Sequence, residues 1–220
     1  MIYNKFGDSM IKDNIKGILK ELKNSKLIAV SKTKPVSDIL EAYEEGIRDF
    51  GENHVQEILE KKDQLPNDIR WYMIGHLQTN KVKDIIDKVY LIHSVDTVKL
   101  AKEIDKQAKK KDLLVNILLE LNIASEDSKY GFKVDELDDA IREISLLSNV
   151  SIKGLMCVAP FTPTPEDNRK YFKEMNELKK KYNLEILSMG MSNDYLIADA
   201  EGSTYVRIGT KIFGERDYTK

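Results

Sequence analysis

Short apolar runs alternate along the chain with longer segments in which apolar residues recur every three or four positions. These two patterns are typical of buried strands and of amphipathic helices, respectively. An amphipathic pattern over residues 8–24 predicts an N-terminal helix. The apolar runs predict strands at 26–34, 47–50, 71–74, 89–94, 113–121, 151–158, 185–189 and 204–208.

One helical pattern separates each predicted strand from the next. These helices are expected at 38–45, 55–62, 81–87, 97–110, 137–147, 166–182 and 193–201. Strictly alternating strands and helices predict right-handed βαβ units and a parallel sheet. Eight such units in 220 residues predict an α/β protein, a (β/α)8 TIM barrel with an extra N-terminal helix.

A doubly wound sheet is the competing architecture. It is disfavoured because no Gly-x-Gly-x-x-Gly turn follows the first strand and the composition shows no break at the midpoint. No linker or low-complexity segment divides the chain. We therefore expect residues 1–220 to form a single domain.

The charge balance argues against nucleic acid as a partner. There are 35 basic and 37 acidic residues, and the lysine runs, including Lys61-Lys62, fall late in predicted helices, where solvated side chains complement the helix dipole.

The single cysteine, Cys157, excludes an intrachain disulfide and is expected in the core. The N-terminus has no apolar run, and no segment is long enough to span a membrane, so we expect a cytoplasmic protein without a membrane partner. The three histidines lack metal-ligand spacing, so no metal site is expected.

Lys32 is the first candidate for chemistry, because it follows the first predicted strand. In such barrels the functional groups gather at the C-terminal ends of the strands. Alternation places Lys32 and Lys34 on the side of Ile28 and Val30, towards the barrel mouth. A poorly hydrated lysine becomes a nucleophilic amine that can hold a carbonyl compound as a Schiff base, and Lys34 would lower its pKa further by repulsion. The alternative is a pair of solvated lysines.

Other predicted strand ends carry polar groups that suit a small ligand. Asn53 follows the second strand and could orient a ring substituent. Ser192 follows the seventh strand, where it is expected at a helix N-terminus, and Gly209-Thr210 follows the eighth strand. Loops after strands seven and eight bind phosphate in many barrels, although two ordinary glycine turns are the alternative.

Arg207 is predicted inside the barrel, on the eighth strand. A buried arginine is costly unless an acceptor meets it, and its own strand contains no acidic residue. The acceptor is either a carboxylate from another strand or a ligand, and we favour a ligand.

Six segments together resemble the YggS/PROSC family of pyridoxal 5′-phosphate (PLP) homeostasis proteins. They are AVSKTKP, FGENHVQE, GHLQTNK, GLMCVAP, GMSND and VRIGTKIFGERDY. The resemblance implies a barrel like the N-terminal domain of alanine racemase, with PLP as the cofactor. By matching positions, it implies that Lys32 forms the internal aldimine, that Ser192, Gly209 and Thr210 hold the phosphate, that Arg207 faces the pyridine nitrogen and that Asn53 lies beside the ring. His54 stands where the family has tyrosine, and His76 lies at a variable position.

The resemblance implies a PLP-binding protein of vitamin B6 homeostasis without robust catalysis. An arginine only donates hydrogen bonds, so it disfavours protonation of the pyridine nitrogen and weakens the ring as an electron sink. The chain also ends before the second domain that supplies a catalytic tyrosine in alanine racemases, which further implies a monomer. Apo forms of PLP-dependent enzymes are the implied partners. The alternatives are an amino-acid racemase of low activity and a cofactor-free Schiff-base aldolase.

Overall fold

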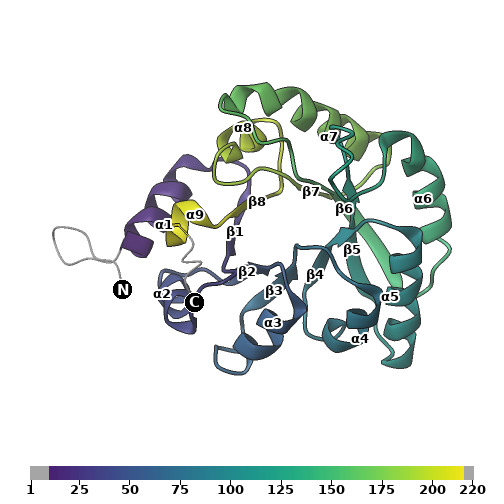
Figure 1. Cartoon of the computed structure of the whole chain (residues 1–220), viewed down its shortest axis with the longest axis horizontal. Helices are drawn as coiled ribbons and strands as arrows, with labels where there is room; N and C mark the ends of the chain where they lie inside the picture. Colours follow the sequence, from purple (N-terminus) through teal and green to yellow (C-terminus); the bar gives the residue numbers. More distant parts are fainter. Residues whose placement is uncertain (1–9, 216–220) are drawn as a thin grey trace.

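Eight parallel strands close into a barrel in the order in which they follow one another along the chain (Figure 1). The computed structural model describes residues 10–215. The strands are β1 Lys26–Val30, β2 Asp49–Glu52, β3 Arg70–Met73, β4 Leu91–Val95, β5 Val115–Leu121, β6 Val150–Cys157, β7 Ile186–Ser188 and β8 Tyr205–Ile208. The last strand pairs with the first, with Ile28 opposite Arg207, and this pairing closes the barrel.

The helices form an outer layer around the strands (Figure 1). They are α1 Met10–Glu21, α2 Val36–Glu44, α3 Val55–Lys62, α4 Val82–Ile85, α5 Val98–Lys110, α6 Leu137–Ile144, α7 Arg169–Lys181, α8 Tyr195–Ala200 and α9 Thr210–Phe213. Short 3-10 turns lie at Thr79–Lys81, Val134–Glu136 and Pro165–Asn168. The extra helix α1 packs beside α2 and α9, where the two ends of the described chain meet.

Alternation along each strand produces two cores. Leu27 and Ala29 face outward into the large core shared with the helices. The intervening Ile28 faces inward, into a smaller cluster in the barrel interior. That inner cluster comprises Ile28, Tyr72, Leu91, Leu118, Met156 and Tyr205. A strand with both faces buried needs apolar side chains on each, which explains why the strands are near-continuous apolar runs.

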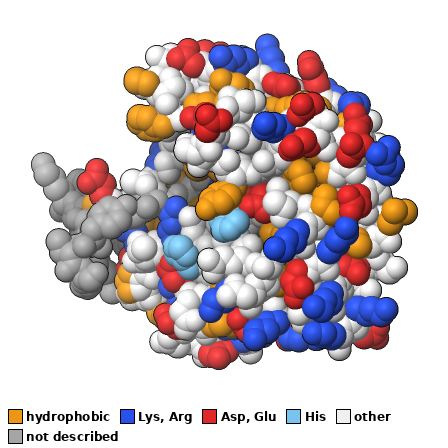
Figure 2. All heavy atoms as spheres, turned by 45° about the vertical axis from the view of Figure 1, so that its right-hand side comes forward, with side chains coloured by type: hydrophobic (Ala, Val, Ile, Leu, Met, Phe, Trp, Pro, Cys, Tyr) orange, Lys and Arg blue, Asp and Glu red, His pale blue; other side chains and the backbone are white. Residues whose placement is uncertain are grey.

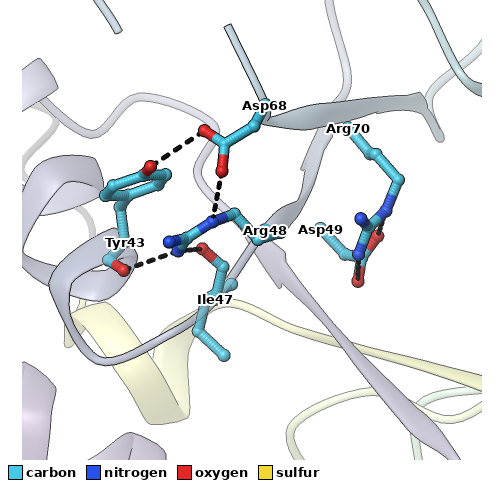
Figure 3. Close-up of polar contacts among 6 residues, drawn as sticks. All are labelled: Tyr43, Ile47, Arg48, Asp49, Asp68 and Arg70. Carbon is cyan, nitrogen blue, oxygen red and sulfur yellow. Dashed lines mark hydrogen bonds and ion pairs between the residues drawn. The ribbon is translucent and has the colours of Figure 1, made fainter. Parts of the chain in front are cut away.

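A polar cluster joins α2 to the N-terminal ends of β2 and β3 (Figure 3). Arg70 binds Asp49 through two nitrogens, at 2.6 and 2.7 Å. The Arg48 Nε donates to Asp68 at 2.7 Å, and its guanidinium lies 3.6 Å above the centre of the Tyr43 ring. Polar groups at this end of a barrel stabilise the fold, since the chemistry of such barrels is found at the opposite end.

The predicted barrel and its N-terminal helix are confirmed, but some boundaries differ. Strand β1 ends at Val30 and not at residue 34, and the helix α9 after the last strand was not expected. The predicted start of the first helix at Asp8 and the end of the last motif, at 216–218, lie outside the described residues. Within residues 10–215, no helix is long and apolar enough to cross a membrane.

Candidate functional site

A pocket of about 490 Å³ opens at the C-terminal ends of the strands. This volume is within the range of small-molecule sites. All six residues named from the sequence line it, namely Lys32, Asn53, Ser192, Arg207, Gly209 and Thr210. Apolar side chains of Val30, Ile74, Val158 and Met191 form part of the wall. The pocket therefore combines a lysine, an arginine, small polar groups and apolar surface.

Lys32 reaches this pocket from a turn and not from the strand. The Lys34 N–H donates to the Ser31 carbonyl at 3.0 Å, and Thr33 has a φ of 63°. A threonine rarely adopts this left-handed conformation, because its branched side chain makes it costly. The predicted position of Lys32 is right, but the strand alternation used to predict it stops at Val30.

A buried ionic network holds this turn. The Thr33 N–H donates to Glu57 Oε2 at 2.7 Å, and the Ser31 hydroxyl donates to Glu52 Oε1 at 2.6 Å. The Lys61 Nζ donates to the Ser31 carbonyl, to Glu52 and to Glu57, at 3.0, 2.9 and 2.7 Å. Burial raises the pKa of Glu52 to about 7, against the opposing effects of Lys61 and Ser31. These contacts fix the backbone on both sides of Lys32.

The prediction that Lys61 lies on a solvated face is wrong. The Lys61 side chain is buried because Glu52, at the end of β2, lies beneath α3 and forms an ion pair with the Lys61 ammonium group. Glu52 was not identified from the sequence either. Glu57 precedes Lys61 by four residues, a spacing that could have signalled an ion pair on one helix face.

Lys34 also lines the pocket, but its amino group is directed to the end of α9. The Nζ donates to the carbonyls of Phe213, Gly214 and Glu215, at 2.9, 3.3 and 2.9 Å. Cations bind favourably at such helix C-terminal carbonyls. Lys34 therefore ties the turn after β1 to the segment after β8, and its predicted effect on the pKa of Lys32 stays a prediction.

Arg207 is buried in the barrel interior as predicted, but neutral groups meet it. Its Nη1 donates to the Ser188 hydroxyl at 2.5 Å and its Nη2 to the Cys157 carbonyl at 2.9 Å. No carboxylate forms an ion pair with it among residues 10–215. Arginine has five N–H donors, so donors remain for a group in the pocket that Arg207 lines.

Ser188 connects Arg207 to a buried histidine. Its hydroxyl lies 3.0 Å from His93 Nδ1. Since Arg207 can only donate to Ser188, the hydroxyl proton is directed to His93, which accepts it at Nδ1. Burial and the nearby Arg207 hold the pKa of His93 well below its usual range. The barrel interior below Arg207 therefore contains a neutral histidine.

The loops after β7 and β8 form the polar side of the pocket. Ser192 and Gly209-Thr210 line it together, and the Lys211 N–H lies 3.4 Å from the Ser192 hydroxyl. Thr210 begins α9, so its N–H has no acceptor within that helix. The expectation that Ser192 begins a helix is wrong. Helix α8 begins at Tyr195, because Asp194 accepts the Met191 N–H at 2.7 Å and closes a turn first.

Asn53 lies where the loops after β2 and β3 touch. A Cβ atom at Gly75 would lie 2.4 Å from the Asn53 carbonyl oxygen, so only glycine allows this approach. The adjacent His54 is exposed at the start of α3 and does not line the Lys32 pocket. Cys157 is buried as expected, and burial raises its pKa to about 12, so the thiol is inert.

A second pocket, of about 630 Å³, adjoins the first and shares Asn53, Ile74 and Val158 with it. Glu120 lines this second pocket and is only 9% exposed. Burial and the nearby Asp96 raise the pKa of Glu120 to about 7, while Arg207 opposes them. Glu120 was not identified from the sequence, although a single carboxylate within the most apolar predicted strand was a usable signal.

Glu120→Gln is expected to make the protein more stable at high pH. Because the pKa of Glu120 is raised on folding, the folded state loses stability as pH rises from about 4.5 through about 7. An amide does not ionise, so between pH 4, where both proteins are uncharged at this position, and pH 8 the variant should gain about 3 kcal/mol of stability over the native chain. Urea unfolding at both pH values measures the difference. The exposed Glu177→Gln on α7 should show no such gain, and an equal effect in both variants would contradict the assignment.

Comparison with known proteins places this chain in a family. The model described as alanine racemase, N-terminal domain, matches residues 9–217. A pyridoxal phosphate homeostasis protein of Aquifex aeolicus is 44% identical over 201 residues, which are 88% of each chain.

Solved structures agree with this relationship. PipY of Synechococcus elongatus, a structure with PLP bound, is 35% identical, with a TM-score of 0.84 over 93% of this chain and 100% of that one. Alanine racemase of Clostridium difficile shares the fold at 16% identity, with a TM-score of 0.77 over 96% of this chain and 60% of that one. The predicted resemblance is thereby confirmed: the chain belongs to the alanine racemase N-terminal domain family and, within it, to the YggS/PROSC group of pyridoxal phosphate homeostasis proteins.

Proposed function

We propose that this protein binds PLP reversibly through the amino group of Lys32 and serves PLP homeostasis without robust catalysis. The observation that carries the proposal is the meeting of Lys32, Arg207 and the Ser192 and Gly209-Thr210 loops in one pocket. A flat aromatic aldehyde with a phosphate tail needs an amine, an apolar wall and phosphate donors. This pocket contains all three, so the residues fit the cofactor.

Each group in the pocket has a distinct role in this proposal. Lys32 would hold the aldehyde carbon of PLP as a Schiff base. Ser192, Gly209 and Thr210 would donate to the phosphate, since a hydroxyl and the N–H groups at a helix start suit an anion. Val30, Ile74 and Val158 would cover the faces of the ring, and Asn53 would orient a ring substituent. When bound, PLP supplies a reactive carbonyl carbon and an electron-accepting ring.

Arg207 supports binding without robust turnover. Its guanidinium is held by Ser188 and Cys157, and among residues 10–215 no carboxylate pairs with it. A cation that only donates hydrogen bonds stabilises an unprotonated nitrogen opposite it and repels a protonated one. An electron-accepting ring is weaker when its nitrogen stays neutral. The names of the curated relatives, which describe homeostasis, agree with this proposal.

We extend the proposal to the setting of the protein. It acts as a cytoplasmic monomer that supplies PLP to apo forms of PLP-dependent enzymes. The closed barrel supports the monomer, since it leaves no open sheet edge within residues 10–215. On the face shown in Figure 2, acidic and basic side chains are interspersed, as is typical of a surface that does not bind nucleic acid.

The experiment that tests this function separates delivery from catalysis. The PLP-loaded protein is mixed with a purified apo-enzyme that needs PLP, and recovered activity is compared with that from an equal amount of free PLP. We expect activity to return while the loaded protein alone incorporates no solvent deuterium at the Cα of L-alanine. Sustained deuterium incorporation, with loss of optical rotation, would overturn the proposal in favour of a racemase. A purified chain that takes up no PLP would favour the cofactor-free alternative.

A further inference from the structure

The second pocket, next to the Lys32 pocket, has no role in the function proposed above. It is built from the loops after β2 and β3, the start of α3, β5 with the segment after it, and Val158 after β6. Its lining includes Asn53, His76, Gln78, Glu120 and Tyr130. Because Asn53, Ile74 and Val158 line both pockets, a ligand here would lie beside a ligand at Lys32.

Glu120 is the buried group that this pocket leaves without a partner. Only 9% of the residue is exposed, and within residues 10–215 its carboxylate accepts no hydrogen bond and forms no ion pair. The charged groups that act on it are Asp96, which repels it, and Arg207, which attracts it. A buried carboxylate without donors is costly, so a cationic donor that enters the pocket is stabilised.

Three other polar groups of the pocket can accept hydrogen bonds. The His76 Nδ1 lies 2.8 Å from Asp96 Oδ2, so Nδ1 carries a proton towards Asp96, and Nε2 is an acceptor in the neutral ring. The side-chain amides of Asn53 and Gln78 have no partner among the described residues and each offers an oxygen. These acceptors line the same pocket as Glu120 and offer sites for further N–H donors.

An aromatic pair and a lysine complete the pocket. Tyr130 stacks on the His76 ring, with the ring centres 4.0 Å apart, and an aromatic face attracts a cation. Histidine side chains are open to solvent on the face shown in Figure 2. Lys81 is exposed where it lines the pocket. Nearby, Lys129 is already paired with Glu126 and donates to the Val158 carbonyl at 3.2 Å.

We propose that this pocket is a subsite for a small primary amine, whose ammonium group binds Glu120. An ammonium carries three donors and one positive charge, which match the carboxylate and the neutral acceptors around it. The exposed Lys81 suits a carboxylate on the same ligand, so a small α-amino acid makes use of both ends. Binding here is non-covalent and does not depend on PLP. That the amine then lies beside PLP rests on the function proposed above.

Calorimetric titration of the PLP-free protein tests the subsite. Ethylamine and L-alanine are the probes, and propionate is the probe without an ammonium group. We expect saturable binding of both amines and none of propionate. Glu120→Gln should weaken both amines on the order of tenfold or more, since it removes a charge-assisted contact. Lys81→Ala should weaken L-alanine and leave ethylamine unchanged, which separates an amino acid from a simple amine.

Glu177→Gln, on the outer face of α7, is the matched control and should bind both probes as the native chain does. Circular dichroism verifies that every variant is folded. Equal binding of ethylamine by the native and Glu120→Gln proteins would overturn the subsite, and so would equal binding of propionate. Portions of the same protein samples are loaded with PLP, and their absorption spectra are recorded separately. A native protein that binds neither amine but shows the PLP spectrum is a failure of the subsite alone, whereas a native protein that binds the amines but shows no PLP spectrum is a failure of the proposed function alone.

Discussion

Lys32→Ala is expected to abolish the Schiff-base absorption of the PLP-loaded protein. The variant lacks the amine that would bind the aldehyde carbon, while the phosphate loops and Arg207 stay in place. PLP held there non-covalently should be lost on gel filtration. The absorption spectrum after gel filtration, together with a phosphate assay, measures both effects, and we expect the band to disappear in full.

The matched control is Lys180→Ala, an exposed lysine on the outer helix α7. It should keep the spectrum of the native protein. Circular dichroism shows whether both variants retain the barrel. If Lys32→Ala kept the band and the stoichiometry of PLP, another lysine would be the attachment point and the assignment of Lys32 would be wrong.

Lys61→Met is expected to lower the free energy of unfolding by about 3 kcal/mol at pH 8, a penalty typical of breaking a buried ion pair. The variant leaves Glu52 buried with the Ser31 hydroxyl as its remaining partner and removes the donor to the Ser31 carbonyl. Urea unfolding measures the loss. Because the same contacts hold the turn at Lys32, the variant should also take up PLP more weakly.

A double mutant separates the buried charge from the lost packing. Glu52→Gln removes the carboxylate, so Lys61→Met should cost much less in that background. Lys62→Met is the control on the same helix, since within the described part of the chain Lys62 pairs only with the exposed Asp63, and it should change stability by no more than about 0.5 kcal/mol. If Lys61→Met were as mild as Lys62→Met, the network would not be supporting the turn.

The hydrophobic pattern was sufficient to predict the barrel fold, because each strand and each helix has its own local pattern in the sequence. It also placed Arg207 inside the barrel, since β8 pairs with β1 in any closed barrel and alternation sets which side chains face inward. The six candidate residues meet in one pocket because five of them follow strand ends, Arg207 lies near the C-terminal end of β8, and all these ends of a parallel barrel lie on one side.

The contacts that pattern reasoning missed join residues far apart in the chain. Strand β1 ends at Val30 because the Ser31 hydroxyl bonds Glu52, 21 positions away, and Thr33 bonds Glu57, 24 positions away. Local periodicity carries no information on such pairs. The burial of Lys61 depends on the same partners, so its helical pattern alone suggested a solvated face.

For Arg207, the sequence predicted that the buried charge needs hydrogen-bond acceptors, but not which groups supply them. The acceptors are the Ser188 hydroxyl and the Cys157 backbone carbonyl. A sequence does not reveal which backbone carbonyl points into the barrel. Glu120 is the opposite case. Its strand was predicted, and only the significance of a carboxylate on the buried face was overlooked.

Borohydride reduction of the native protein loaded with PLP, followed by peptide mapping by mass spectrometry, tests the central claim most directly. Reduction fixes a Schiff base irreversibly on the lysine that formed it. We expect the added pyridoxyl phosphate mass on the peptide that contains Lys32, with fragment ions that place it on that residue. An adduct on Lys34 or Lys129 in place of Lys32, or no adduct in a protein that retains PLP, would contradict the account.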